Sequence, residues 1–284
     1  MLHASHMGMA YEFNQAAQQL LEEDLVQSAC VLPTGPWFDE CAQWLQEQPQ
    51  RDVGICLSLN SPSRVYRLRP LQDCHRVPSL VDADGFLWGS ILQVTLRAEA
   101  TEVQREVAAQ IKRARSAGMR PTHLMTDMGA LLTRPDLTRV YLETAEKHWL
   151  PAVIVELTPP LVETLRAEGF PITDELIEMV SRYPLPKLDD IQQMPDADSY
   201  ESKRQKFYTL IREMRPGLTQ VFLRPAKPSP GLKFVSERWK NQVWETKLLK
   251  DLDVQEFMEQ EQVVFTNWRE IMSRFENGQM EVQP

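Results

Sequence analysis

Short apolar segments alternate along this chain with segments of helical periodicity. Every connection between the apolar segments is long enough for a crossover, and helical spacing fills most of them. Strands joined in this way pair in parallel with right-handed connections, because parallel pairing needs a long crossover. The alternation therefore predicts an α/β fold with seven parallel strands. The predicted strands are residues 1–4, 26–32, 53–59, 122–127, 152–157, 218–223 and 262–266.

We expect this sheet to close into a barrel, because a motif that is typical of open sheets is absent. No glycine-rich phosphate fingerprint follows the first predicted strand, which argues against an open dinucleotide-binding sheet. We therefore expect an irregular, TIM-like (β/α) barrel. We assign residues 1–275 to one barrel domain and residues 276–284 to a polar tail. Residues 60–100 lack periodicity, and so long an excursion is typical of a cover that arches over a binding mouth.

Composition narrows the range of partners. A net charge of −9 argues against nucleic acid, because a phosphate backbone needs a basic face. No run approaches the ~18 apolar residues of a membrane span, and no basic segment with an apolar stretch marks a secretion signal. The four cysteines lack CxxC pairing, as expected for reduced thiols in the cytoplasm. The composition leaves open whether the chain forms a homo-oligomer.

The segment from Gly118 to Gly129 gives the first candidates for chemistry. It follows a long amphipathic helical pattern and contains a short predicted strand that ends at Asp127. Side chains at the carboxyl ends of parallel strands face a shared mouth, where active sites are built. We therefore single out His123 and Asp127. The alternative is a structural histidine and an aspartate that caps the next helix.

Other polar residues stand at the same ends of the predicted strands. His6, Cys56 and Asp127 come from three different strands, and all three are residue types that bind zinc. Any barrel mouth also collects some polar groups by chance. The full set is Ser5, His6, Thr34, Cys56, Ser58, Asp127, Glu156, Arg224, Thr266 and Asn267.

Several segments together resemble the YdjC-type carbohydrate deacetylases, a family that includes chitooligosaccharide and hopanoid-intermediate deacetylases. The resemblance spans almost the whole chain. It implies an irregular seven-stranded (β/α) barrel in which a divalent metal activates water against an N-acetyl group on a sugar. The matching segments are residues 2–4, 8–9, 54–59, 77–85, 121–129, 217–220 and 263–270.

The metal ligands that this resemblance implies are replaced. Family members use the second Asp of an Asp-Asp pair and two histidines, and these positions hold His6, Cys56 and Asp127 here. Nitrogen, thiolate and carboxylate together would suit Zn²⁺ better than a hard cation such as Mg²⁺.

The catalytic positions implied by the family are also replaced. The general base falls at Ser5, the Asp before the third ligand falls at Met125, and the assisting late-strand His falls at Arg224. Serine has no useful basicity near neutral pH, methionine cannot orient a ligand, and arginine stays protonated. These side chains do not support the ordinary deacetylase mechanism.

Two interpretations follow. In the first, the protein is a non-catalytic family member without a cofactor, and its mouth still binds a small carbohydrate. His123 would then support the site, and Trp88 or Trp37 would offer a stacking surface, unless the tryptophans serve core packing. In the second, His6, Cys56 and Asp127 form a rearranged zinc site, with Glu156 as the base.

A further hypothesis concerns the centre of the mouth. Asp127 and Arg224 end two predicted strands, and a carboxylate and a guanidinium in one partly buried site form strong bidentate pairs. We expect such a pair, with His6 nearby, in place of the metal. The alternative is that Arg224 points to solvent and Asp127 caps the helix that begins near Pro135.

Overall fold

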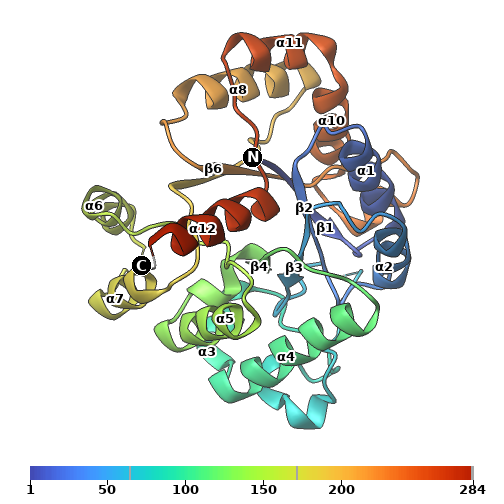
Figure 1. Ribbon diagram of the computed structural model, residues 1–284. Helices are drawn as coiled ribbons and strands as arrows, with labels where there is room; N and C mark the ends of the chain where they lie inside the picture. The colour runs from blue at the N-terminus through green and yellow to red at the C-terminus, as the bar shows by residue number, and fades with distance from the viewer. Residues whose placement is uncertain (64, 171, 283–284) are drawn as a thin grey trace.

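The computed structural model describes residues 1–282 except 64 and 171. Its centre is a parallel sheet of six strands in the order β4-β3-β2-β1-β6-β5. The sheet curls into a half-barrel (Figure 1). This confirms the α/β class and the parallel sheet. The strands are β1 (Leu2–Met7), β2 (Ser28–Val31), β3 (Val53–Leu57), β4 (Leu124–Thr126), β5 (Asp190–Gln193) and β6 (Thr219–Leu223).

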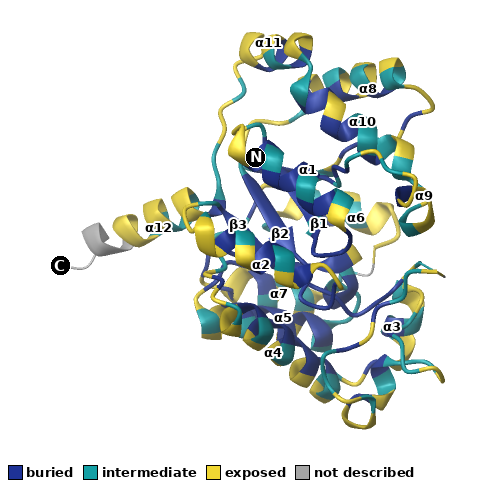
Figure 2. Ribbon diagram, turned by 90° about the vertical axis from the view of Figure 1, so that its right-hand side faces the viewer, coloured by how far each residue is buried: buried dark blue, intermediate teal, exposed yellow. Residues whose placement is uncertain are grey.

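Helices lie around the sheet (Figures 1 and 2), and those that pack on it do so with an apolar face. Helix α4 shows why: Val103, Val107, Ile111 and Ala114 recur at helical spacing, and all four are buried. The helices are α1 (Tyr11–Glu22), α2 (Phe38–Glu47), α3 (Ile91–Arg97), α4 (Ala100–Ser116), α5 (Pro135–His148), α6 (Pro159–Ala167), α7 (Asp174–Arg182), α8 (Tyr200–Glu213), α9 (Leu232–Val235), α10 (Trp239–Lys250), α11 (Leu252–Gln260) and α12 (Trp268–Val282), with 3-10 turns η1 (Cys74–Arg76), η2 (Pro78–Leu80) and η3 (Asp127–Leu132).

The seven-stranded barrel is not confirmed. Residues 152–157 make only isolated bridges, Leu124 with Ala152 and Val155 with Leu188, and so lie between β4 and the chain that enters β5. Residues 262–266 form no strand, and Val264 is 87% exposed. An apolar, β-branched run favours a strand only where a neighbouring strand is available for pairing.

Two further expectations about the chain need correction. The polar residues 184–198 are not among the predicted strands, but they contain β5, which pairs with β6 over its whole length. The predicted polar tail continues helix α12 through residue 282, and residues 283–284 lie outside the described part.

The interior of the half-barrel begins with a layer of buried side chains near the amino ends of the strands. His3 Nε2 lies 3.0 Å from His123 Nε2, and Trp268 stacks on His123 with ring centroids 5.5 Å apart. The indole of Trp268 donates to Gln220 Oε1 at 2.9 Å. Gly54 makes room for this layer, because a Cβ there would lie 2.5 Å from the His123 carbonyl oxygen.

Asp52 attaches helix α12 to this end of the sheet. Its carboxylate accepts hydrogen bonds from the Ser28 hydroxyl at 2.6 Å, the Thr122 hydroxyl at 3.1 Å and the Arg269 backbone N–H at 2.7 Å. Burial raises the pKa of Asp52 in spite of these donors. The carboxylate thus joins β2, the approach to β4 and the first turn of α12.

Residues 60–100 do not arch over the mouth as one cover. Among the described residues of this segment, only its beginning borders a cavity there, through Asn60, Pro62, Ser63, Val65 and Leu68. The part that follows packs along α4, where the Glu106 carboxylate accepts the backbone N–H groups of Leu71 and Gln72, each at 2.9 Å.

No described helix is both long enough and apolar enough to cross a bilayer. The single-domain assignment, the cytoplasmic location and the exclusion of nucleic-acid and membrane partners stay predictions.

Candidate functional site

Three polar residues meet at the carboxyl ends of the strands. His6 lies near the end of β1, Asp127 follows β4, and Arg224 follows β6. His6 Nε2 is 3.3 Å from Asp127 Oδ1, although β2 and β3 separate their strands in the sheet. The curl of the sheet brings the two side chains together and forms the mouth that the sequence predicts.

The backbone around these residues is unusual. His6 has φ 73°, and the pairing register of β1 with β2 shifts between Ala4 and Met7. Met128, directly after Asp127, has φ 50°. Such conformations cost roughly 1–3 kcal/mol each for residues with a side chain, and they cluster at functional sites. Both strand ends are therefore held in strained conformations at the mouth.

Burial controls the charge at the mouth. It raises the pKa of Asp127 to about 6, against the opposing effect of Arg224. It also holds the pKa of His6 well below 6.5, and Arg224 and Arg238 add to that effect. Near pH 7, a neutral imidazole therefore faces a carboxylate that is mostly ionised.

Arg224 does not form the predicted pair with Asp127. Within the described chain, its guanidinium makes no ion pair and donates no hydrogen bond, and only its backbone N–H is engaged, with Glu245 Oε2 at 2.6 Å. The alternative for Asp127 is also wrong, because Asp127 begins the turn η3 and Arg134 is the N-cap of α5. His6 is the residue that contacts Asp127.

Sulfur atoms fill the layer beneath this contact. Cys30 Sγ lies 3.6 Å from Met125 Sδ, and Cys56 is fully buried beside them. A hydrogen bond with Cys30, followed by burial, raises the pKa of Cys56 well above its ordinary value. Cys56 is therefore a protonated thiol packed against sulfur.

Ser5, at the position of the family's general base, makes structural hydrogen bonds. The Ser5 hydroxyl donates to the Leu223 carbonyl oxygen at 3.1 Å and lies 3.2 Å from His6 Nδ1. Considering only residues that the structure describes, no three His, Cys, Asp or Glu side chains gather closely enough to hold a metal ion. The residues at the predicted ligand positions do not fit the family metal.

Two cavities open at the mouth, with volumes of about 740 and 520 Å³. Met128, Arg224 and Arg238 line both, and so stand between them. The larger cavity has aromatic walls at Phe170 and Phe222. The smaller one is lined by His6, Asp127, Asn60, Phe234 and the start of the segment of residues 60–100.

Most charges around these cavities are paired. Arg238 donates to both oxygens of Asp196, at 2.7 and 2.5 Å. Lys203 Nζ lies 2.9 Å from Glu245 Oε1, and both side chains are almost completely buried. Sequence reasoning did not find these four residues, because none of them stands at the end of a predicted strand.

Three predicted substrate-binding residues line neither cavity as the described residues form them. His123 belongs to the layer at the amino ends of the strands. The Trp88 indole donates to the Ser79 carbonyl oxygen at 2.7 Å, and Glu156 lies 3.0 Å from Lys187 Nζ. Each of the three therefore has a structural contact away from the mouth.

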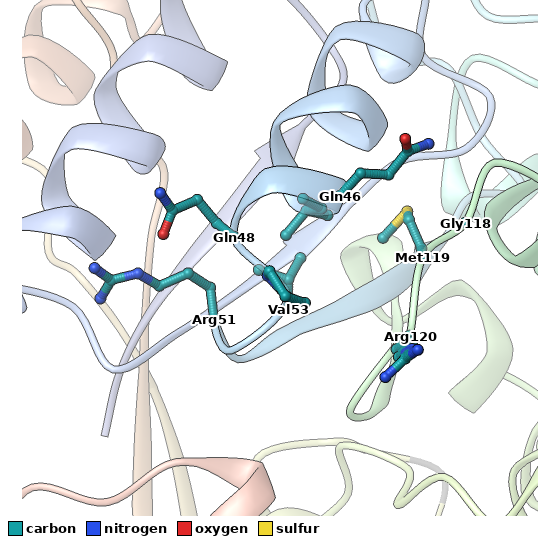
Figure 3. Close-up of a pocket in the computed structure, with 9 residues that line it drawn as sticks. Gln46, Gln48, Arg51, Val53, Gly118, Met119 and Arg120 are labelled. Atoms are coloured by element: carbon teal, nitrogen blue, oxygen red, sulfur yellow. The ribbon is translucent and has the colours of Figure 1, made fainter.

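A third pocket, of about 250 Å³, lies near the start of β3 (Figure 3). Gln48 and Arg51 line one side of it, and Gln46, Met119 and Arg120 line the other. It contains none of the predicted site residues and lies at the opposite end of the strand from Cys56. The mouth therefore remains the candidate site.

Comparisons with known proteins agree with this fold. A carbohydrate deacetylase from Thermus thermophilus is 32% identical over 234 residues, covering 81% of this chain and 78% of that protein. A carbohydrate deacetylase from Thermoanaerobacter pseudethanolicus is 22% identical over 267 residues, covering 94% and 96%. A crystal structure from Enterococcus faecalis, of a protein named for cellobiose-phosphate cleavage, superposes with a TM-score of 0.76 at 23% identity, covering 95% and 97%, and supports the fold alone. The model of the YdjC-like protein family matches residues 1–260, and the chain belongs to this family.

Proposed function

We propose that this family member binds carbohydrate at its mouth but lacks the side chains for metal-assisted deacetylation. The proposal draws on the relatives named carbohydrate deacetylase and on the residues that replace the family ligands. One observation carries it. His6 and Asp127 contact each other, while Cys56 lies a layer deeper with its sulfur packed against Cys30.

Metal-assisted hydrolysis needs converging ligands with one open position, and a base that takes a proton from water. Cys56 is fully buried beneath the contact of His6 with Asp127, and no three ligand-type side chains of the described residues converge there. The Ser5 hydroxyl at the base position donates to a backbone carbonyl and has no useful basicity. These observations support a mouth without the converging ligands and the base that hydrolysis needs.

The shape and lining of the mouth support carbohydrate binding. The larger cavity, about 740 Å³, is in the usual range for ligand sites of roughly 300–1,000 Å³. Phe170 and Phe222 offer apolar faces for a sugar ring, while Gln193 and Arg224 offer hydrogen-bonding groups. A carbohydrate requires this combination, because its rings have both apolar faces and polar edges.

An acetate-release assay on N-acetylglucosamine oligomers, with Mg²⁺, Mn²⁺ or Zn²⁺ supplied, tests the catalytic part. We expect release at background, with the Thermus thermophilus relative as the positive control. Calorimetric titration of the same oligomers tests binding. Metal-dependent release that disappears in Asp127→Ala would show that the site is catalytic.

A zinc hydrolase with a rearranged site is the second candidate. The 3.3 Å contact between His6 and Asp127 favours it, because two ligand types already stand together. Elemental analysis after zinc loading and dialysis separates the candidates. One zinc per chain, lost in both His6→Ala and Cys56→Ser, would establish this site, whereas we expect no retained zinc.

A further inference from the structure

The guanidinium of Arg224 is an unsatisfied cation at the junction of the two cavities. Arg224 is partly buried and lines both of them. Its five side-chain N–H donors make no hydrogen bond or ion pair with any described residue. None of its nitrogens is a buried atom without a partner, so the guanidinium is open to the cavities and can pair with an anion that a ligand supplies.

Three acidic groups lie around Arg224, and each has another partner. Asp127 contacts His6 and forms no ion pair with the guanidinium. Asp196 holds Arg238 with both oxygens. Glu245 accepts from Lys203 Nζ with one oxygen and from the Arg224 backbone N–H with the other. An anion that pairs with the Arg224 side chain therefore has to come with the ligand.

Two buried acceptors at the mouth lack a well-formed hydrogen bond. Asn60 Oδ1 has no donor among the described residues, and Asp127 Oδ1 has only the His6 ring nitrogen at 3.3 Å. Both residues line the smaller cavity. The amide nitrogen of Asn60 faces the Met128 sulfur at 3.2 Å, which leaves its oxygen directed elsewhere. Buried acceptors normally have a donor, and a ligand with hydroxyl groups would supply it.

We propose that the mouth selects acidic carbohydrates, with the carboxylate of a uronic acid residue on Arg224 and sugar hydroxyls on Asp127 and Asn60. This inference rests on the proposed carbohydrate-binding function and specifies its ligand class. A uronic acid carries a carboxylate and several hydroxyls on one ring, and so matches one unpaired cation beside two acceptors that lack a well-formed hydrogen bond.

The geometry of arginine favours a carboxylate. The planar guanidinium forms two parallel hydrogen bonds with the two oxygens of a carboxylate, and such charge-assisted pairs are stronger than neutral hydrogen bonds. Because Arg224 borders both cavities, an acidic residue bound there leaves room on either side. The ligand is therefore an oligosaccharide whose acidic unit lies at the junction.

The test compares ligands that differ only in charge. Trimers of galacturonic and of glucuronic acid, and the methyl ester of each, are titrated calorimetrically into the full-length protein. The esters keep the size and the ring hydroxyls but lose the negative charge. We expect at least one acid to bind on the order of 10- to 100-fold more tightly than its ester, the range for a hydrogen bond to a charged group.

Variants then assign the effect to one residue. Arg224→Gln should abolish the preference for the acid while ester binding persists. Arg224→Lys should keep part of the preference, because lysine retains the positive charge but not the planar guanidinium that forms two parallel hydrogen bonds. Arg120→Gln, in the pocket near the start of β3, is the matched control and should leave the preference unchanged.

The outcomes separate this inference from the proposed function. Equal binding of acid and ester by the unmodified protein, or a preference that survives Arg224→Gln, overturns the acidic-ligand assignment. If N-acetylglucosamine trimers still bind in that case, the proposed function stands. If no carbohydrate binds, both fail. Tighter binding of a phosphorylated disaccharide than of either acid overturns the carboxylate assignment in favour of phosphate.

Discussion

Asp127 is buried, and burial makes the charged form of its carboxyl group unfavourable. It is 3% exposed, and its nearest partner is a histidine whose pKa is itself lowered. Natural proteins keep such groups mainly where a ligand or a reaction uses them. The residue therefore reduces the stability of the free protein, and this effect depends on pH.

We predict that Asp127→Asn changes how stability varies with pH. The pKa rises from 3.8 to about 6 on folding, so the protonated carboxyl favours the folded state at low pH, and this contribution is lost as the pH rises through that interval. Relative to the asparagine variant, the unmodified protein should lose up to about 3 kcal/mol between pH 3.8 and about 6. Urea unfolding across this range measures the difference.

Asp136→Asn is a control of opposite sign. The hydrogen bond from Arg134 lowers the pKa of Asp136, so its contribution to stability is present at neutral pH and declines on acidification. Parallel stability curves for the unmodified protein and Asp127→Asn from pH 3.8 to 7 would contradict the burial argument.

The sequence predicted some site residues better than others. His6 and Asp127 could be placed because strand ends meet at one edge of a parallel sheet. Their contact in place of the expected Arg224–Asp127 pair could not, because it depends on the left-handed backbone at His6 and on the direction of one guanidinium. His123 shows a related limit, because only the three residues of β4 separate it from Asp127 at the mouth.

At the scale of elements, helix α12 contributes more to the packing of the sheet than its position near the end of the sequence suggests. The preceding residues 262–266 were predicted as a strand, and the last residues as a tail. Instead, the helix places Trp268 in the interior and Arg269 against Asp52. Sequence periodicity alone could not show this, because the contact partners, Gln220 and Asp52, are far away along the chain.

We predict that Trp268→Ala destabilises the protein by about 3–5 kcal/mol, the usual cost of truncating a large buried aromatic side chain. The residue is fully buried, stacks on His123 and donates to Gln220. Denaturant unfolding measures the loss.

Trp149→Ala is the matched control. Trp149 also contacts α12, through Glu276, but it is 46% exposed. Its replacement should cost less than about 1 kcal/mol. Equal losses in the two variants would show that α12 is held by its outer face and not by Trp268.

At the scale of the molecule, the half-barrel has a weak side. Between β4 and β5, residues 152–155 make only isolated bridges, supported by single hydrogen bonds such as Val153 N–H to the Leu124 carbonyl oxygen at 2.8 Å. The central strands β1 and β2, in contrast, each pair with strands on both sides. Stability is therefore distributed unevenly around the sheet.

We predict that this weak side opens before the centre of the sheet. In native-state hydrogen exchange, the amides of Val153, Glu156 and Leu188 should exchange at least ~10-fold faster than those of Ala29 and Cys30 in β2. Mass spectrometry or NMR measures both sets in one experiment. Uniform protection around the sheet would show that the bridged segment unfolds only with the whole molecule.

The first four strands and β6 could be predicted because they are apolar, buried and flanked by clear helices. Strand β5 could not, since Asp190, Gln192 and Gln193 look like loop residues and pair only because β6 offers its free edge. The parallel order follows from the long connections, whereas closure depends on how the segment of residues 152–157 bends between its neighbours.

Trp268, which fills the amino-end side of the interior, sets how a ligand can move. A ligand that reaches Asp127 enters and leaves through the cavity at the mouth, because Trp268, His123 and His3 fill the interior at the amino ends of the strands. An oligosaccharide bound as proposed would therefore lie across the opening and would not thread through the half-barrel. It would reach successive units by sliding along the rim or by release and rebinding.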